Sequence, residues 1–88
     1  MVDQKLNWKA LAASFGVTWA IFVFLLGLSA ALLDWGTSFV NLMSSIYMGY
    51  APTVVGSFIG IPWALLDGFI AGALIALLYN YFKEAFEP

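Results

Sequence analysis

The sequence predicts an all-α integral membrane protein: a two-span helical hairpin with an interfacial or re-entrant amphipathic helix between the spans. Hydrophobic residues make up 64% of the 88-residue chain and charged residues only 9%, against about 45–50% and 25% in typical soluble domains. A soluble fold of this size could not bury so much apolar surface. Two long apolar runs and a shorter amphipathic segment between them complete the pattern. We therefore expect a single membrane domain over residues 1–88.

The first expected span covers residues 10–33, a run without any charged side chain. At 1.5 Å per residue it reaches about 36 Å, enough to cross the hydrocarbon core with some tilt. Its apolar core is also much longer than the roughly 7–15 residues of a signal-peptide core. We therefore expect a transmembrane helix here.

The segment between the spans, residues 36–50, reads GTSFVNLMSSIYMGY. Its apolar side chains recur at helical spacing: Phe39, Val40, Leu42, Met43, Ile46, Tyr47 and Tyr50. Its small polar side chains gather on the other side: Thr37, Ser38, Asn41, Ser44 and Ser45. An uncharged amphipathic segment of this length is too short to cross the bilayer. We expect a helix that lies in the interface plane or dips back into the membrane; a plain loop is the alternative.

The second expected span covers residues 53–82. Pro52 suits a helix start, because its missing N–H would have no partner there. Pro62 lies inside the span, where it removes a backbone hydrogen bond and pushes against the carbonyl of Phe58. We therefore expect a mild kink near Pro62.

The positions of the cations predict the orientation. Lys5 and Lys9 flank the first span, Lys83 flanks the second, and the connecting segment has no cation. Such a distribution places both termini in the cytoplasm, so we expect a multi-pass protein of the cytoplasmic (inner) membrane. Aromatic residues near the ends of the spans are expected to form an inner and an outer interfacial belt. These are Trp8, Tyr79 and Tyr81 for the inner belt, and Trp35, Tyr47 and Tyr50 for the outer belt.

Small residues stand four apart along the second span: Gly56, Gly60, Ala64, Gly68, Gly72 and Ala76. The first span carries a matching seam: Ala13, Gly16, Ala20, Val23, Gly27 and Ala30. Small residues let helix backbones approach closely, and such packing drives helix association in lipid. The simplest interpretation is that the two spans pack on each other.

The row of small residues also predicts a second neighbour. When residues stand four apart, each step moves the row by about 40° around the helix, which amounts to about 160° from Gly56 to Gly72. One straight partner helix cannot follow the row over that angle. We therefore expect Gly56 and Gly60 to face one neighbour. We expect Gly68, Gly72 and Ala76 to face a second helix, from another polypeptide. The sector between them is assigned to lipid through its bulky residues: Ile59, Leu66, Phe69 and Leu77.

One acid, Asp67, lies at the middle of the second span, where an ionised carboxylate costs at least about 2.5–3.5 kcal/mol. Neither span holds a Lys, Arg or His that could pair with it. Its azimuth is close to that of Gly56, Gly60 and Trp63, so we expect Asp67 to face the packed interior. Thr18 is its expected hydroxyl partner, and the indole N–H groups of Trp19 and Trp63 are further candidate donors.

Three roles are open for Asp67. A protonated carboxyl group hydrogen-bonded to the first span would be a structural clasp, worth about 0.6–2 kcal/mol between membrane helices. Lining of a pore is the second role, with further polar side chains at Ser14, Thr18 and Ser29. Proton carriage is the third, although no second titratable group continues a relay.

Asp34 is expected to mark the membrane boundary and to cap the following segment.

Composition also restricts the chemistry. The chain has no Cys and no His, which removes disulfides, thiolate sites and the usual metal and haem ligands. A net charge of −2 with three cationic residues excludes a nucleic-acid footprint. No catalytic constellation is present, so we expect a non-enzymatic protein without a cofactor or metal.

The segment SIYMGYAPTVVGSFIGIPWALLDGFIAGALIALLYNYF (45–82), with WAIFVFLLGLSAALLDWG before it, resembles a family of small bacterial and archaeal membrane proteins labelled bacteriophage holin or holin-like. The matching pieces are YMGY, GSFIG, WALLDGFIAG and LIALLYNYF. The resemblance covers most of the chain. It implies hairpins that oligomerise and permeabilise the cytoplasmic membrane.

Two functions are therefore expected. The first is an accessory or structural subunit that packs through its small-residue faces into a larger membrane assembly. The alternative is a self-oligomerising, holin-like membrane pore. In both, the partners are the lipid bilayer and other transmembrane helices, either copies of this chain or different subunits.

Overall fold

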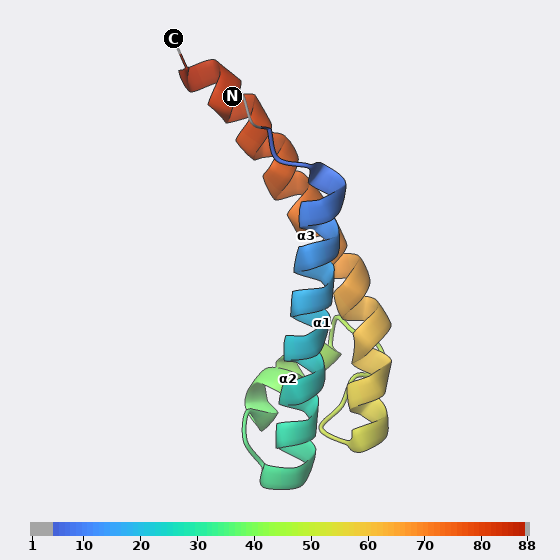
Figure 1. Cartoon of the computed structure of the whole chain (residues 1–88). Helices are drawn as coiled ribbons and strands as arrows, with labels where there is room; N and C mark the ends of the chain where they lie inside the picture. The colour runs from blue at the N-terminus through green and yellow to red at the C-terminus, as the bar shows by residue number, and fades with distance from the viewer. Residues whose placement is uncertain (1–4, 88) are drawn as a thin grey trace.

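The structure is a computed structural model that describes residues 5–87. Within these residues it contains three helices and no strand: α1 (Trp8–Leu33), α2 (Thr37–Ser44) and α3 (Val54–Phe86). The expectation of an all-α chain is confirmed. α1 and α3 are both long and apolar enough to cross a membrane. Figure 1 shows them side by side, with α2 and the loop after it beside one end of the pair.

α1 begins two residues before the expected start because Asn7 caps it. The Asn7 side chain accepts hydrogen bonds from the backbone N–H groups of Lys9 and Ala10, at 3.0 and 3.2 Å, which satisfies donors that a helix start leaves unpaired. The helix ends at Leu33 as expected. Asp34 then takes a left-handed backbone conformation, with φ at 53°.

Asp34 does not cap α2 in the expected way. The N-cap position of α2 is Gly36, which has a positive φ of 79° and no side-chain capping bond. Asp34 instead accepts a hydrogen bond from the Thr37 hydroxyl, at 2.7 Å. Asp34 is the C-cap residue of α1, and this places it at the end of α1 rather than at the start of α2.

The connecting helix is shorter than the expected 36–50. α2 stops at Ser44, and residues 45–49 form turns. The Ser44 and Ser45 hydroxyls each bond back to a carbonyl three residues earlier, at 2.7 Å, and such local bonds compete with helix continuation. The loop then folds inward, so that Tyr47 and Tyr50 are only 2% and 1% exposed. Their expected place in an outer aromatic belt was therefore wrong, whereas Trp35 is exposed.

α3 begins at Val54, where the Thr53 side chain accepts a hydrogen bond from the Gly56 N–H at 2.8 Å. It stays helical through Pro62 and continues to Phe86, four residues past the expected end. The start of α1 and the end of α3 lie at the same end of the molecule (Figure 1). There, the Asn80 side chain bonds to both the N–H and the carbonyl of Leu6, at 2.9 and 3.0 Å, and Lys5 pairs with Glu84 at 2.7 Å.

Small residues join the two long helices, as expected. The buried residues of α1 are Ala12, Gly16, Ala20, Val23, Gly27 and Ala30. Those of α3 are Gly56, Ser57, Gly60, Ala64, Gly68, Gly72 and Ala76. Ala12 therefore occupies the place that was expected for Ala13, which is exposed. All six members of the α3 row are buried within this chain.

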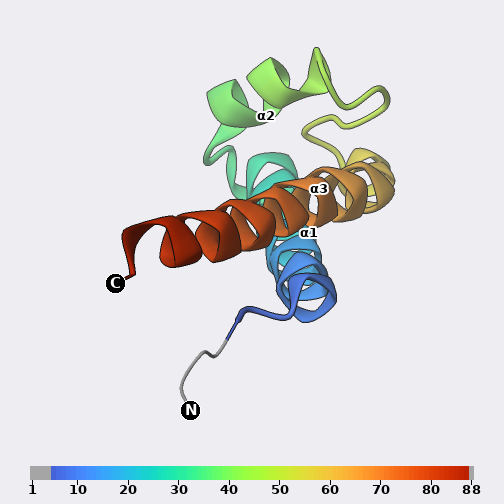
Figure 2. The ribbon, with the colours of Figure 1, turned by 90° about the horizontal axis from the view of Figure 1, so that it is seen from above.

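The expectation that the row serves two neighbours was wrong. A Cβ added to Gly68 would lie 2.8 Å from the Cα of Gly16, and one added to Gly72 would lie 2.8 Å from the Cα of Ala12. Both glycines therefore face α1 of the same chain. Figures 1 and 2 show that α3 crosses α1 obliquely. An oblique crossing follows a row spaced by four, because such rows are themselves inclined to the helix axis.

The other end of the row is covered by the loop. A Cβ added to Gly60 would lie 2.6 Å from the ring of Tyr50 and 3.1 Å from Val23. At this end of the row α3 is therefore covered by both the loop and α1, and a Cβ added to Gly27 of α1 would lie 3.1 Å from the Cα of Ser57. The bulky residues assigned to lipid do lie on the outside: Ile59, Leu66, Phe69 and Leu77 are exposed.

Candidate functional site

Asp67 lies on the outer surface of the helix pair. It is the only charged residue between Val54 and Phe82, and its side chain is exposed. The expectation that it faces the packed interior was wrong. At this level the buried seam of α3 runs through Ala64 and Gly68, and the residue just before Gly68 lies about 100° away from it around the helix. Asp67 consequently stands at the edge of the contact between the helices.

A chain of two hydrogen bonds holds the Asp67 carboxylate. The Tyr47 hydroxyl donates to Asp67 Oδ2 at 2.5 Å. The indole Nε1–H of Trp19 donates to the same Tyr47 oxygen at 2.8 Å. Trp19 belongs to α1, Tyr47 to the loop and Asp67 to α3, so one phenol connects all three parts. Within residues 5–87, Tyr47 is the only hydrogen-bond donor to this carboxylate.

Trp63 supports the phenol rather than the carboxylate. Its ring stacks on Tyr47, with centroids 6.2 Å apart and planes 8° from parallel. Its Nε1–H donates to the Met48 carbonyl at 2.9 Å. The expected role of Trp63 as a donor to Asp67 was therefore wrong. It fixes the loop against α3 and so fixes the position of Tyr47.

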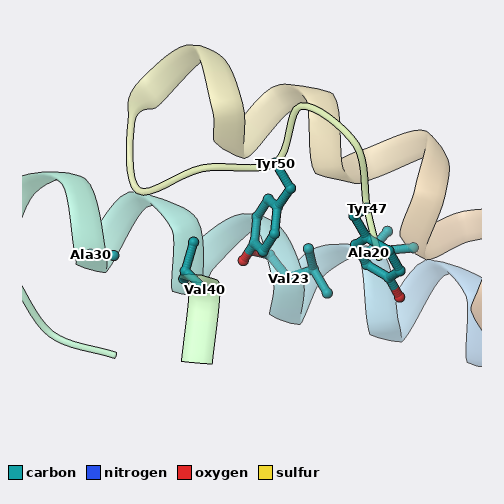
Figure 3. Close-up of a cluster of buried hydrophobic side chains, with 7 residues drawn as sticks. Ala20, Val23, Ala30, Val40, Tyr47 and Tyr50 are labelled. Atoms are coloured by element: carbon teal, nitrogen blue, oxygen red, sulfur yellow. The ribbon is translucent and has the colours of Figure 1, made fainter. Parts of the chain in front are cut away.

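The second tyrosine of the loop anchors it to α1. The Tyr50 hydroxyl donates to the Val23 carbonyl at 2.7 Å, in a buried position. Figure 3 shows Tyr47 and Tyr50 both directed from the loop towards α1, among Ala20, Val23 and Val40. Burial raises the pKa of Tyr50 above its ordinary value of 10.0. Burial, together with the hydrogen bond to Asp67, raises the pKa of Tyr47 to about 12. Both phenols are therefore neutral donors at physiological pH.

The hydroxyls expected near Asp67 lie elsewhere. Thr18 is exposed and lines a different shallow hollow, with Leu11, Ser14 and Phe15. Two residues from both Gly16 and Ala20, it points away from the seam. Ser14 and Ser29 bond to carbonyls of their own neighbourhood, Ser14 to Ala10 at 2.8 Å. The single chain thus does not assemble the polar set that was expected to line a pore.

Sequence reasoning missed Tyr47 as the partner of Asp67. In the sequence, Tyr47 is recognisable only as one of the apolar residues that recur at helical spacing in the amphipathic segment. That spacing predicts an apolar contact and does not predict a hydrogen bond to a carboxylate on α3. The contact depends on the return of the loop towards the middle of the helix pair.

Two apolar hollows lie on either side of Asp67. The first, of about 330 Å³, lies between the loop and α3; its lining residues are Met43, Ile46, Tyr47, Trp63, Leu66, Asp67 and Ile70. The second, of about 280 Å³, lies between α1 and α3; its lining residues are Phe15, Trp19, Asp67, Gly68 and Ala71. We call the surface formed by Asp67 and these two hollows the Asp67 face. It is an apolar surface with one fixed carboxylate at its centre.

The described residues contain no cluster of His, Cys, Asp or Glu that could hold a metal ion. Comparisons with protein-family models, with curated proteins and with solved structures find no match for this chain. The geometry of the chain itself therefore carries the functional proposal.

Proposed function

We propose that this chain is a small, non-enzymatic integral membrane protein that serves as an accessory or structural subunit of a larger membrane assembly. In this proposal α1 and α3 form a two-span hairpin in the cytoplasmic (inner) membrane. The observation that carries the proposal is the exposed Asp67 carboxylate, held by Tyr47 at the middle of an apolar helix.

The surface of the helix pair supports insertion in a membrane. Only 28% of the most apolar window of α1 and 22% of that of α3 are buried within the chain. The core helix of a soluble protein would be mostly covered by its own fold. Here the remaining apolar surface needs lipid or another protein to cover it, and both coverings exist within a bilayer.

The Asp67 face supports a role as a subunit. In a bilayer, an uncovered ionised carboxylate at this depth costs at least about 2.5–3.5 kcal/mol. A neighbouring protein that covers the face reduces this cost by supplying polar partners. The small-residue row cannot attract such a neighbour, because it is already occupied by α1 and the loop. We therefore assign the contact with a neighbouring protein to the Asp67 face.

The distribution of charge supports an orientation with both termini in the cytoplasm. Lys5 pairs with Glu84 where the start of α1 meets the end of α3, and Lys83 precedes Glu84 on α3. The opposite end, with α2 and its loop, contains no cation. Cationic flanks favour the cytoplasmic side of a bacterial inner membrane.

A holin-like pore built from copies of this chain is the second candidate. The observation that favours it is that Asp67 lies on the outer surface, so a ring of copies could direct several carboxylates into a shared lumen. The two candidates differ in what covers Asp67, a different protein or another copy.

Native mass spectrometry of the complex, extracted in mild detergent from its own membrane, separates the two candidates. Co-elution with larger, different subunits at a fixed stoichiometry supports the subunit. A single peak or a ladder of identical chains contradicts it and supports the pore. Conductance of vesicles that contain the purified chain, compared with Asp67→Asn, then tests whether the carboxylate lines a conducting path.

A further inference from the structure

We propose that the Asp67 face docks a transmembrane helix of a different protein that carries one basic side chain, Lys or Arg, at the middle of the membrane. This inference rests on the proposed function, because it specifies the chemistry of the neighbour that the subunit packs against.

The charge of the chain itself points to a foreign cation. Its three cationic residues, Lys5, Lys9 and Lys83, all flank the apolar segments, and residues 10–82 contain no cation. Neither this chain nor a second copy of it can place a positive charge at the depth of Asp67. Charged groups in the membrane interior pair with an opposite charge or a polar partner. A cation that pairs with Asp67 at this depth therefore comes from a different protein.

The Asp67 carboxylate can accept a further hydrogen bond at Oδ1. Tyr47 occupies Oδ2, and no donor within residues 5–87 bonds to Oδ1. The bonds from Trp19 to Tyr47 and from Tyr47 to Asp67 hold the group in place before any partner arrives. An ammonium or guanidinium group that approaches from outside meets a fixed acceptor, so little ordering remains to be done on binding.

The shape of the face suits a helix. The two hollows extend along α3 from Trp63 to Ala71, a distance of about 12 Å, or roughly two helical turns. A partner helix that directs its basic residue at Asp67 presents apolar side chains one turn before and one turn after it. Those side chains would occupy the two hollows and pack against their apolar lining residues.

The depth of Asp67 favours a helix over a lipid headgroup. Asp67 lies about 20 Å along α3 from its start at Val54 and about 28 Å from its end at Phe86, so it lies well inside a hydrocarbon core that is about 30 Å thick. The amine of a lipid headgroup stays at the membrane interface. A side chain on a transmembrane helix reaches the middle directly.

The test uses a synthetic transmembrane peptide as the probe. The chain has no Cys, so Phe86→Cys, at a position that is 82% exposed, takes a single acceptor dye. The full chain is reconstituted in phosphatidylcholine vesicles with a donor-labelled Leu/Ala peptide that carries one central Lys. The matched control peptide has norleucine at that position. Energy transfer at several peptide-to-lipid ratios gives the association constants.

We expect the Lys peptide to associate at least about tenfold more tightly than its norleucine control, the scale of a strong polar contact between membrane helices. Asp67→Asn should remove this preference. Asn retains an acceptor for the Tyr47 hydroxyl, and circular dichroism checks that the variant keeps its helices. In the chain that retains Asp67, moving the Lys of the peptide one turn towards either end should also weaken association. This comparison tests the proposal without any change in the Asp67 face.

Three results would overturn the proposal. They are equal association of the Lys and norleucine peptides, a preference that persists in Asp67→Asn, and Asp67-dependent energy transfer between copies of the chain that exceeds transfer to the Lys peptide. The last result would assign the face to a second copy. A heteromeric complex in native mass spectrometry together with equal peptide binding would overturn only the partner's chemistry, whereas identical chains alone would contradict the proposed function.

Discussion

The Tyr47 hydroxyl donates a hydrogen bond to the Asp67 carboxylate at 2.5 Å, although one residue lies in a loop and the other at the middle of α3. The same hydroxyl accepts a hydrogen bond from Trp19 on α1. Loop, α1 and α3 therefore meet at a single oxygen atom. The fold and the proposed function both depend on this contact.

Tyr47→Phe should destabilise the chain and loosen the loop. The substitution removes both hydrogen bonds while keeping the ring that stacks on Trp63. We expect the free energy of unfolding to fall by about 1–2 kcal/mol, measured by SDS titration of the micelle-bound protein with tryptophan fluorescence as the signal. Tyr81→Phe is the matched control, because Tyr81 is exposed. Equal stabilities of the two variants would contradict the role of the contact.

Gly68→Ala should separate the long helices. The added Cβ would lie 2.7 Å from the Phe15 carbonyl oxygen and 2.8 Å from the Gly16 Cα, and backbone atoms cannot move aside as a side chain can. We expect a loss of about 1–3 kcal/mol in the same titration. Gly16→Ala is a milder comparison, because its nearest contact would be 3.0 Å. A neutral effect of Gly68→Ala would show that the helices do not approach this closely.

Stability should fall at high pH through Tyr47. Its pKa of about 12 in the folded chain lies above the ordinary value of 10.0, so the fold favours the neutral phenol. This contribution is fully present below about pH 10 and is lost as the pH rises towards 12. SDS titration at a series of pH values should show the decline, which should be smaller in Tyr47→Phe. An identical decline in both proteins would assign the pH dependence to other groups.

A thiol at the start of α2 should be labelled from outside the cell, whereas one at the C-terminus should not. The chain has no Cys, so Ser38→Cys and Glu87→Cys each introduce one thiol at an exposed position. If both termini are cytoplasmic, a membrane-impermeant maleimide should label Ser38→Cys in intact cells, and Glu87→Cys only after permeabilisation. The reverse pattern would contradict the proposed orientation.

Much of the architecture could be predicted from local patterns. The end of α1 at Leu33 agrees with the first expected span, and α3 differs from the second by one residue at its start and four at its end. These bounds follow from hydropathy and capping residues, which act within a few positions. The burial of Gly16, Ala20 and Gly27 was also predicted, because close approach of helices in lipid requires small residues.

The surroundings of Asp67 could not be predicted in the same way. Its position at the middle of an apolar helix follows from the order of residues, but the direction it faces depends on how α3 crosses α1. The partner Tyr47 was inaccessible to periodicity, because the loop between Ser44 and Thr53 has no repeating geometry from which its path could be extrapolated.

Hydropathy and the spacing of small residues, which act through neighbours one to four positions apart, are enough to specify two long apolar helices, a short amphipathic connection and an acid at mid-span. The packing of the whole α3 row within one chain, the burial of Tyr47 and Tyr50 and the outward position of Asp67 all required the three-dimensional arrangement. The physical reason is that these features arise from contacts between residues about 20 to 60 positions apart, and an oblique crossing of two helices determines which of those residues meet.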